Sequence, residues 1–214
     1  MANHFKNGDG QVIVEAMIGE IQGNKDYLGQ VDGLIGDGDH GMNMNKGFTM
    51  TGENLKGKRE SFTRSLETLG STLFNDIGGS MGPIYGTVFM SMAEAGEGAE
   101  EIDLATFTNM LASGLDALQE IVEAKPGDKT LVDTLAPAVN SLWADCEKQA
   151  DFAEALDRMK LAAEAGKDST KDLVAKFGRS SRLGERSRGV LDAGAVSCNI
   201  LLQAMASEIQ RLLV

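Results

Sequence analysis

Aspartates and glycines alternate between positions 32 and 41, where the chain reads DGLIGDGDHG. Asp32, Asp37 and Asp39 offer carboxylate oxygens from one short segment, and oxygen-only ligand sets favour Mg²⁺ or Ca²⁺ over zinc. The glycines between them let the chain fold back so that the carboxylates converge. Three carboxylates leave a net negative charge around one divalent ion, which makes sense where ions also bridge to phosphate oxygens. We therefore predict a hard-cation site here, and a solvated Asp/Gly turn is the weaker interpretation.

Three better-known motifs fit this region poorly. The glycines match G-x-G-x-x-G, but a dinucleotide site needs a preceding strand and a βαβ unit, and the sequence predicts neither. An EF-hand that starts at Asp37 needs a Glu at its twelfth position, where Phe48 stands. The near P-loop at 52–59 has Arg59 where Ser or Thr must bind Mg²⁺.

Several groups that suit phosphate surround this segment in the sequence. His40 follows the aspartates directly and can donate a hydrogen bond to a phosphate oxygen, and Asn43 lies one helical turn further on. The stretch GGSMGP at 78–83 joins two predicted helices, and a helix N-terminus with exposed N–H groups attracts anions. Taken alone, a turn of this kind is more often a simple helix–helix corner.

A basic segment at 178–189, GRSSRLGERSRG, concentrates four arginines in an acidic protein. Such a loop is usually a solvated surface, but arginine is well suited to bidentate phosphate contacts. The turn KPGDKT at 125–130 leads into another predicted helix.

The composition indicates a globular protein and excludes some partners. The 214 residues are 42% hydrophobic and carry a net charge of −12, which argues against nonspecific nucleic-acid binding. Cys146 and Cys198 lack the spacing of a zinc site, and a reducing compartment suits a chain with so few cysteines. There is no signal-like N-terminus and no run of about 18 apolar residues. We expect a soluble cytoplasmic protein with no membrane or nucleic-acid partner.

Apolar residues recur at helical spacing throughout the chain, and no segment shows the alternation of a strand. Asp103 and Asp151 are predicted helix caps, and Pro137 predicts a kink or break. We expect one all-α domain over 1–214, with the longer connections at 29–40 and 177–188. The predicted helices span residues 10–28, 41–57, 60–77, 83–95, 104–124, 129–147, 152–176 and 189–212.

Taken together, four segments resemble the nucleotide-binding L subunit of dihydroxyacetone kinases. They are DGLIGDGDHGMNMNKGF, GGSMGP, KPGDKT and GRSSRLGERSRGVLDAGA, and their order and spacing extend the resemblance over essentially the whole chain. The resemblance implies an antiparallel eight-helix barrel with a nucleotide–metal site at one end. This implied fold agrees with the helix count that periodicity gives.

The resemblance also implies the site residues. Asp32, Asp37 and Asp39 would hold two Mg²⁺ ions. This chain has Ser80-Met81 and Asp192-Ala193-Gly194 where many members have Ala-Ser and Asp-Pro-Gly, which leaves details of the nucleotide pocket open. The residues implied to bind ADP or ATP are His40, Gly41, Met42, Asn43, Gly78, Gly79, Ser80, Met81, Thr130, Leu131, Arg179, Asp192, Ala193 and Gly194.

The implied reaction is phosphoryl transfer to dihydroxyacetone or a related small ketose, such as erythrulose. In the family a separate K subunit holds the ketose on a histidine, and nothing in this chain resembles a sugar pocket with its own base. In phosphoenolpyruvate-dependent members a phosphotransferase M subunit rephosphorylates bound ADP, whereas nucleotide exchanges in ATP-dependent members. A free-standing L chain favours the split arrangement. The alternative is a non-catalytic regulatory protein that senses its nucleotide.

Overall fold

The computed structural model describes residues 3–214, and regular structure there consists mainly of α-helices. Two three-residue strands and three short 3₁₀ segments complete it. The strands are β1 (His4–Lys6) and β2 (Glu101–Asp103), and the 3₁₀ segments are η1 (Asn7–Asp9), η2 (Thr170–Asp172) and η3 (Arg179–Ser187). The helices are α1 (Gln11–Gly23), α2 (Lys25–Ile35), α3 (His40–Leu55), α4 (Phe62–Asp76), α5 (Met81–Ala95), α6 (Leu104–Ile121), α7 (Val132–Glu147), α8 (Phe152–Ser169) and α9 (Ala193–Leu212).

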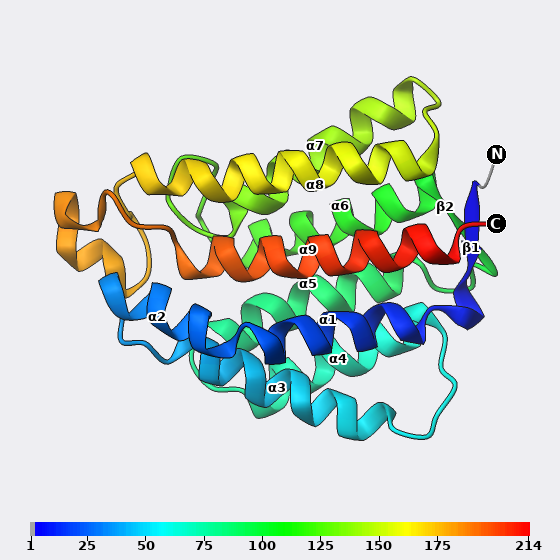
Figure 1. Cartoon of the computed structure of the whole chain (residues 1–214), viewed down its shortest axis with the longest axis horizontal. Helices are drawn as coiled ribbons and strands as arrows, with labels where there is room; N and C mark the ends of the chain where they lie inside the picture. The colour runs from blue at the N-terminus through cyan, green and yellow to red at the C-terminus, as the bar shows by residue number, and fades with distance from the viewer. Residues whose placement is uncertain (1–2) are drawn as a thin grey trace.

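Eight of these helices form a closed ring, which confirms the predicted all-α barrel. Each of α3 to α8 packs against the next helix in the chain, and α1 closes the ring between α9 and α3 (Figure 1). Phenylalanines from four helices, which are at most 1% exposed, fill the interior: Phe48, Phe62, Phe107 and Phe152. Burying the apolar stripe of every helix in one common core is the main stabilising term of such a fold.

Helix α2 stands outside the ring and was not predicted. A single helix over 10–28 was expected, followed by a loop to residue 40. Instead α1 ends at Gly23, and a separate helix begins after Asn24. Leu28, Val31 and Ile35 bury one face of this helix, and α2 packs against α3 and α9 at one end of the barrel (Figure 1). The density of glycine and aspartate in this segment had concealed its helical period.

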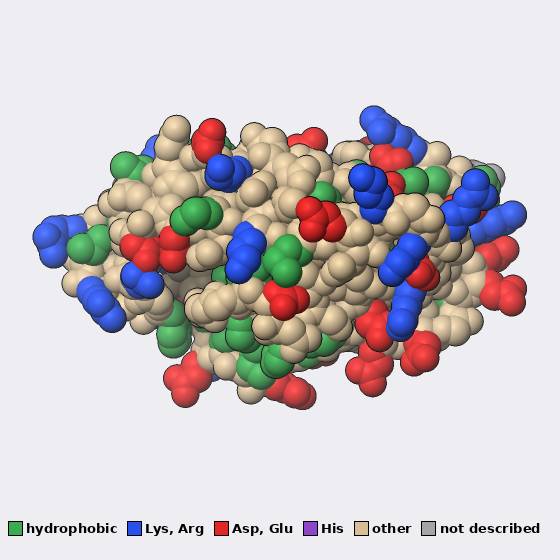
Figure 2. Space-filling model, turned by 90° about the horizontal axis from the view of Figure 1, so that it is seen from below, with side chains coloured by type: hydrophobic (Ala, Val, Ile, Leu, Met, Phe, Trp, Pro, Cys, Tyr) green, Lys and Arg blue, Asp and Glu red, His purple; other side chains and the backbone are tan. Residues whose placement is uncertain are grey.

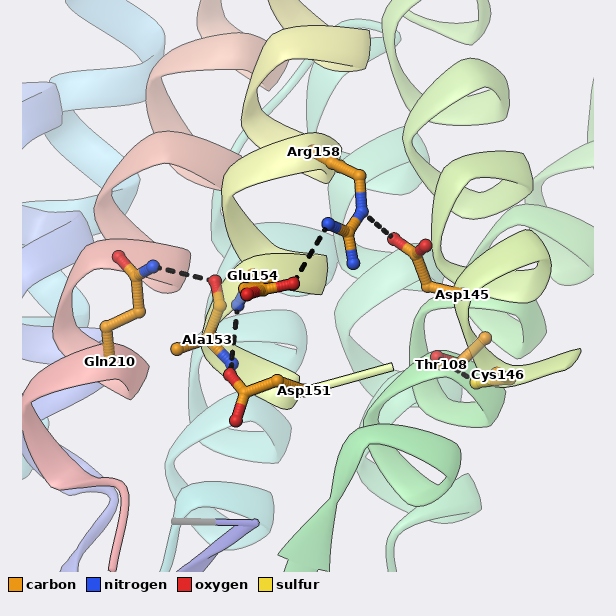
Figure 3. Close-up of polar contacts among 8 residues, drawn as sticks. All are labelled: Thr108, Asp145, Cys146, Asp151, Ala153, Glu154, Arg158 and Gln210. Carbon is orange, nitrogen blue, oxygen red and sulfur yellow. Dashed lines mark hydrogen bonds and ion pairs between the residues drawn. The ribbon is translucent and has the colours of Figure 1, made fainter. Parts of the chain in front are cut away.

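Polar contacts join the last three helices of the ring. Asp151 caps α8, as predicted, by accepting a hydrogen bond from the N–H of Ala153 at 3.0 Å (Figure 3). Arg158 Nε donates to Asp145 Oδ2 at 2.8 Å and so links α8 to α7. Gln210 Nε2 donates to the Ala153 carbonyl at 2.9 Å and links α9 to α8. These bonds complement the apolar packing of the ring.

The other predicted helix signals had mixed outcomes. Asp103 caps α6 by accepting from the N–H of Thr106 at 2.8 Å, which confirms that prediction. Helix α7 runs through Pro137 without a break, so of the predicted kink or break only the kink stays a prediction. Pro137 has no N–H and cannot donate the usual hydrogen bond to the carbonyl four residues earlier, so the helix continues with one backbone bond fewer. Among residues 3–214, no helix is both long enough and apolar enough to cross a membrane.

A small antiparallel pair of strands contradicts the expectation of no strands. His4 lies opposite Asp103 in this pairing, and the N–H of Val214 donates to the His4 carbonyl at 3.0 Å. Strands of three residues are too short to show an alternating pattern, and their pairing depends on contacts distant in the sequence. The pair lies at the end of the barrel opposite α2 (Figure 1).

Candidate functional site

The three predicted metal ligands converge at the α2 end of the barrel. Asp32 lies in the last turn of α2, Asp37 in the connection, and Asp39 directly before α3. One carboxylate oxygen from each lies within 4.8 Å of the others. Asp32 therefore reaches the cluster from a helix rather than from the predicted loop, and this anchors one side of the site.

Glycines give the connection between α2 and α3 its shape. A β-carbon at Gly36 would lie 2.3 Å from Asp32 Oδ1, so a side chain there would displace the carboxylate. Gly38 has φ of +78°, a conformation that glycine adopts without steric cost. The N–H of His40 faces Asp32 Oδ2 at 3.4 Å, which ties the start of α3 to the same carboxylate.

The cluster is electrostatically unfavourable without a cation. Partial burial raises the pKa of Asp39, and the neighbouring carboxylates of Asp37 and Asp32 raise it further. Arg179, at the start of η3, forms an ion pair with Asp37 and offsets part of this charge. Convergent oxygen ligands, mutual repulsion and an accessible position fit a divalent cation such as Mg²⁺.

A cavity of about 360 Å³ opens beside the aspartates and gathers most of the predicted nucleotide residues. Segments from α2 to the start of α9 line it, although they are up to about 160 positions apart in the chain. Lysine and arginine side chains lie at this end of the molecule next to a few acidic ones, and others lie at the opposite end (Figure 2). The predicted residues that line the cavity with the aspartates are His40, Asn43, Gly78, Gly79, Ser80, Met81, Thr130, Leu131, Arg179, Asp192, Ala193 and Gly194.

Gly41 and Met42 do not line this cavity, and their predicted phosphate contacts stay predictions. A β-carbon at Gly41 would lie 2.0 Å from the Lys25 carbonyl oxygen and 2.7 Å from the Gly29 nitrogen. Gly41 is therefore required for the close approach of α3 to α2. The side chain of Met42 is 60% exposed on the outside of the barrel.

His40 contacts the hydroxyl of Ser197, which is itself bonded to Tyr85, and the sequence revealed neither residue. Its Nε2 lies 2.8 Å from Ser197 Oγ, which in turn lies 2.7 Å from the hydroxyl of Tyr85. The Tyr85 hydroxyl also donates to the Gly194 carbonyl at 3.2 Å. Burial lowers the pKa of His40 and favours the neutral ring. Because Nε2 is engaged, a contact between this ring and a phosphate would come from Nδ1.

The turn after Gly78 presents the N-terminus of α5 to the cavity. Gly79 has φ of +76°, and Ser80 precedes the helix without using its side chain as a cap. The first N–H groups of α5 therefore have no side-chain partner from Ser80, as expected for a helix start that receives an anion.

The KPGDKT turn is organised by Asp133, which follows it in α7. Its two carboxylate oxygens accept from the N–H of Gly127 at 2.5 Å and of Thr130 at 2.7 Å. Lys129 also lines the cavity, although the sequence had not marked it as a site residue. Its place inside the KPGDKT motif was the available signal.

Asp192 lies where the basic segment ends and α9 begins. It caps α9 by accepting from the N–H of Ala195 at 2.8 Å. Burial is the main cause that raises the pKa of its carboxyl group to about 6, while the bond from Ala195 and the charge of Lys129 act in the opposite direction. Ionisation of the Asp192 carboxyl group is therefore unfavourable at this position.

Known proteins place this site in a family. The family profile described as the DAK2 domain matches residues 34–207. The chain belongs to the DAK2 domain family. It is 38% identical to the protein named "PEP-dependent dihydroxyacetone kinase 1, ADP-binding subunit DhaL" of Listeria innocua, over 86% of this chain and 88% of that protein. It is 37% identical to the corresponding "ADP-binding subunit DhaL" of Escherichia coli, over 85% of this chain and 87% of that protein.

A solved structure shows the same fold. The chain superposes on the dihydroxyacetone kinase of C. freundii in complex with AMP-PNP and Mg²⁺ with a TM-score of 0.69 and 22% identity. The match covers 93% of this chain but only 33% of that longer kinase chain. The helical barrel of this chain is thus also found as one part of a larger protein.

Proposed function

We propose that residues 1–214 form a single L-type domain that binds ADP or ATP with Mg²⁺ and acts as a subunit of a ketose kinase. The observation that carries this proposal is the convergence of Asp32, Asp37 and Asp39 beside a cavity that also contains Arg179 and the N-terminus of α5. The names of the two relatives support an ADP-binding role. The location of such a complex would be the cytoplasm.

The three aspartates would hold two Mg²⁺ ions, which supply positive charge that neutralises phosphate oxygens during phosphoryl transfer. The chain's own groups would then position the nucleotide. The N–H groups at the start of α5 and the guanidinium of Arg179 would hold phosphate oxygens, while Leu131 and neighbouring apolar residues would enclose the base. The neutral ring of His40 would be kept in place by Ser197.

The proposed acceptor is dihydroxyacetone or a related small ketose on a separate K-type subunit. A phosphotransferase M-type subunit would rephosphorylate the bound ADP, in keeping with the phosphoenolpyruvate-dependent relatives. The test combines this chain with a K-type partner, either ATP or a phosphorylated M-type donor, and candidate ketoses. Formation of a phosphorylated ketose supports the proposal. Nucleotide binding without product in every combination would instead support the nucleotide-sensing alternative.

Asp37→Ala should abolish Mg²⁺-dependent nucleotide binding and leave the helical content unchanged. Asp37 lies in the connection between helices and its side chain pairs with Arg179, so its loss removes a ligand without disturbing the core. Calorimetry with Mg²⁺-ADP and circular dichroism provide the two measurements. Asp116→Ala changes an exposed aspartate on α6, outside the cavity lining, and is the matched control. Retained binding in the Asp37 variant would contradict the metal assignment.

A further inference from the structure

Lys129 is an unusual lysine for its position. Its side chain is among the largest fully buried ones, with the residue only 1% exposed. Its backbone has φ of +62°, a region that residues other than glycine rarely adopt. A buried ammonium group and a strained backbone both carry a free-energy cost, and such features persist where the surrounding structure depends on them.

The ammonium group of Lys129 contacts both ends of one segment. Its Nζ donates to the carbonyl of Thr170 at 2.6 Å and also to the carbonyl of Val190. These two carbonyls flank residues 171–189, which leave the barrel after α8 and return to it before α9. We call residues 170–192 the basic loop, and the place where its two ends meet its neck.

Other bonds close the same neck. The N–H of Gly189 donates to the Lys171 carbonyl at 2.7 Å, and the N–H of Asp192 donates to Thr170 Oγ1 at 3.1 Å. Further out, the N–H of Ala175 donates to the buried Ser187 hydroxyl at 2.9 Å. These bonds make the neck an ordered structure. Lys129, which lies in the KPGDKT turn before α7, is the side chain from outside the loop that contacts both sides of the neck.

The basic loop carries Arg179 to the aspartate cluster. Arg179 pairs with Asp37 and lines the cavity together with Phe177 and Ser180 from the same loop. These residues lie inside the basic loop, away from its two ends. Their position therefore depends on how firmly the neck holds those ends together. A loop whose ends are fixed loses fewer arrangements on binding a ligand than one whose ends separate.

We propose that Lys129 is a positioning residue, whose ammonium group closes the neck of the basic loop and thereby holds Arg179 at the nucleotide site. This inference rests on the proposed function for its effect on nucleotide affinity. The closure of the neck itself is independent of what the cavity binds.

The first test measures hydrogen–deuterium exchange in the nucleotide-free protein. Lys129→Met keeps the length and bulk of the side chain but removes the ammonium group. Amides of residues 171–189 are expected to exchange about tenfold faster or more, since bonds from a charged donor are lost, while amides of α4 and α5 keep wild-type protection. Unchanged exchange in the basic loop, or equal acceleration throughout the protein, would overturn the proposal.

Lys176→Met is the matched control for this experiment. Lys176 also joins the basic loop to the KPGDKT turn, through a 2.5 Å contact with Asp128, but its side chain is 63% exposed. Exposed ion pairs contribute little, so this variant should exchange like the wild type and bind nucleotide equally well. An effect as large as that of Lys129→Met would show that any lysine bridging these segments suffices, and would refute the special role of the neck.

The second test is a double-mutant cycle on Mg²⁺-ADP affinity. Lys129→Met should weaken binding about tenfold in the wild-type background, but less than about twofold when Arg179 is already alanine. Additive losses would refute action through Arg179, because a general loss of stability is independent of that side chain. If the wild type binds no nucleotide, the proposed function fails, and the exchange experiment still decides whether Lys129 closes the neck.

Lys129→Gly is a second variant that tests the same proposal if Lys129→Met fails to fold. Glycine adopts positive φ without strain, so this change removes the ammonium group and relieves the backbone at once. The same local increase in exchange is expected over residues 171–189. Wild-type protection of the loop in this variant would overturn the proposal.

Discussion

At the scale of single residues, the site combines groups whose charges are costly where they stand. Asp39 is crowded by two carboxylates, and Asp192 is held in a largely buried position with its pKa raised to about 6. Lys129 lies beside Asp192, and burial is the main cause that lowers the pKa of its ammonium group. A cavity lined by unfavourably placed charges of both signs is suited to a ligand that carries both a cation and anionic phosphates.

Asp192→Asn should make stability less dependent on pH. The folded-state pKa of Asp192, about 6, lies above its ordinary value of 3.8. Because folding raises the pKa of this carboxyl group, its contribution to the stability of the folded state is fully present below about pH 3.8. This contribution is lost as the pH rises through about 6. Asparagine remains neutral and still caps a helix. Urea unfolding without nucleotide from pH 4 to 8 should therefore show the variant gaining stability relative to the wild type as pH rises.

A constant difference between Asp192→Asn and the wild type over that pH range would contradict this assignment. Asp168→Asn is a suitable control, because Asp168 is an exposed carboxylate near the end of α8. Its substitution should leave the pH profile nearly parallel to that of the wild type.

At the scale of helices, the spacing of the three aspartates depends on how closely α3 approaches α2. Gly41 permits this approach, because its missing β-carbon leaves room for the backbone of Lys25 and Gly29. Asp32 belongs to one of these helices, and Asp39 adjoins the other. Helix packing at Gly41 therefore sets a distance within the proposed metal site, although Gly41 does not line the cavity.

Gly41→Ala should destabilise the protein by about 1–3 kcal/mol, since its new methyl group would overlap backbone atoms that cannot move independently. It should also weaken Mg²⁺ binding by separating Asp32 from Asp39. Gly19→Ala is the control, because Gly19 lies on an exposed helical surface with nothing within 4 Å of an added β-carbon. That change should be neutral or stabilise by up to about 1 kcal/mol. Denaturant unfolding of both variants measures the contrast, and equal stabilities would contradict it.

The helices of the ring were predictable because each has an apolar stripe that faces one shared core. The same periodicity missed α2, in which glycines and aspartates interrupt the stripe formed by Leu28, Val31 and Ile35. It also missed the pairing of β1 with β2, which depends on contacts between distant segments. Local patterns identify helices that bury a regular face, but not short elements that are defined by their partners.

The site was predictable to the extent that its residues lie in dense local motifs. The aspartates, the GGSMGP turn and the basic segment at 178–189 drew attention because their composition is unusual for their neighbourhoods, and the family resemblance selected Arg179 among the four arginines of that segment. Tyr85 and Ser197 did not, because each lies in a helix whose pattern indicates core packing. The hydrogen bonds of Ser197 to Tyr85 and to His40 arise only when α5, α9 and α3 meet in the ring.

At the scale of the whole molecule, the cavity lies where several segments of the barrel end together. Residues from α2, α3, α5, α7 and α9 line it, so a ligand there contacts elements that separate when the ring opens. Ligand binding should therefore oppose global unfolding rather than only a local movement.

With Mg²⁺ present, nucleotide at 100 times its dissociation constant should raise the free energy of unfolding by about 2.7 kcal/mol. Chelation of Mg²⁺ by EDTA should remove most of this gain, because the aspartates would then repel the phosphates. Urea unfolding with nucleotide alone, Mg²⁺ alone and both together gives the comparison. An equal gain from nucleotide in EDTA would argue against a metal-mediated contact.

The ion pair between Arg179 and Asp37 predicts that a cation and an anion would bind cooperatively at the proposed site. A cation that takes Asp37 must displace the guanidinium, and the displaced guanidinium is then free to pair with a phosphate. Each ligand would then raise the affinity for the other by the same factor, as thermodynamic reciprocity requires. Arg179→Met should accordingly bind Mg²⁺ alone more tightly than the wild type but lose most of this mutual enhancement, which titrations of each ligand with and without the other would measure. Weaker binding of Mg²⁺ alone by that variant would mean that Arg179 does not compete for Asp37.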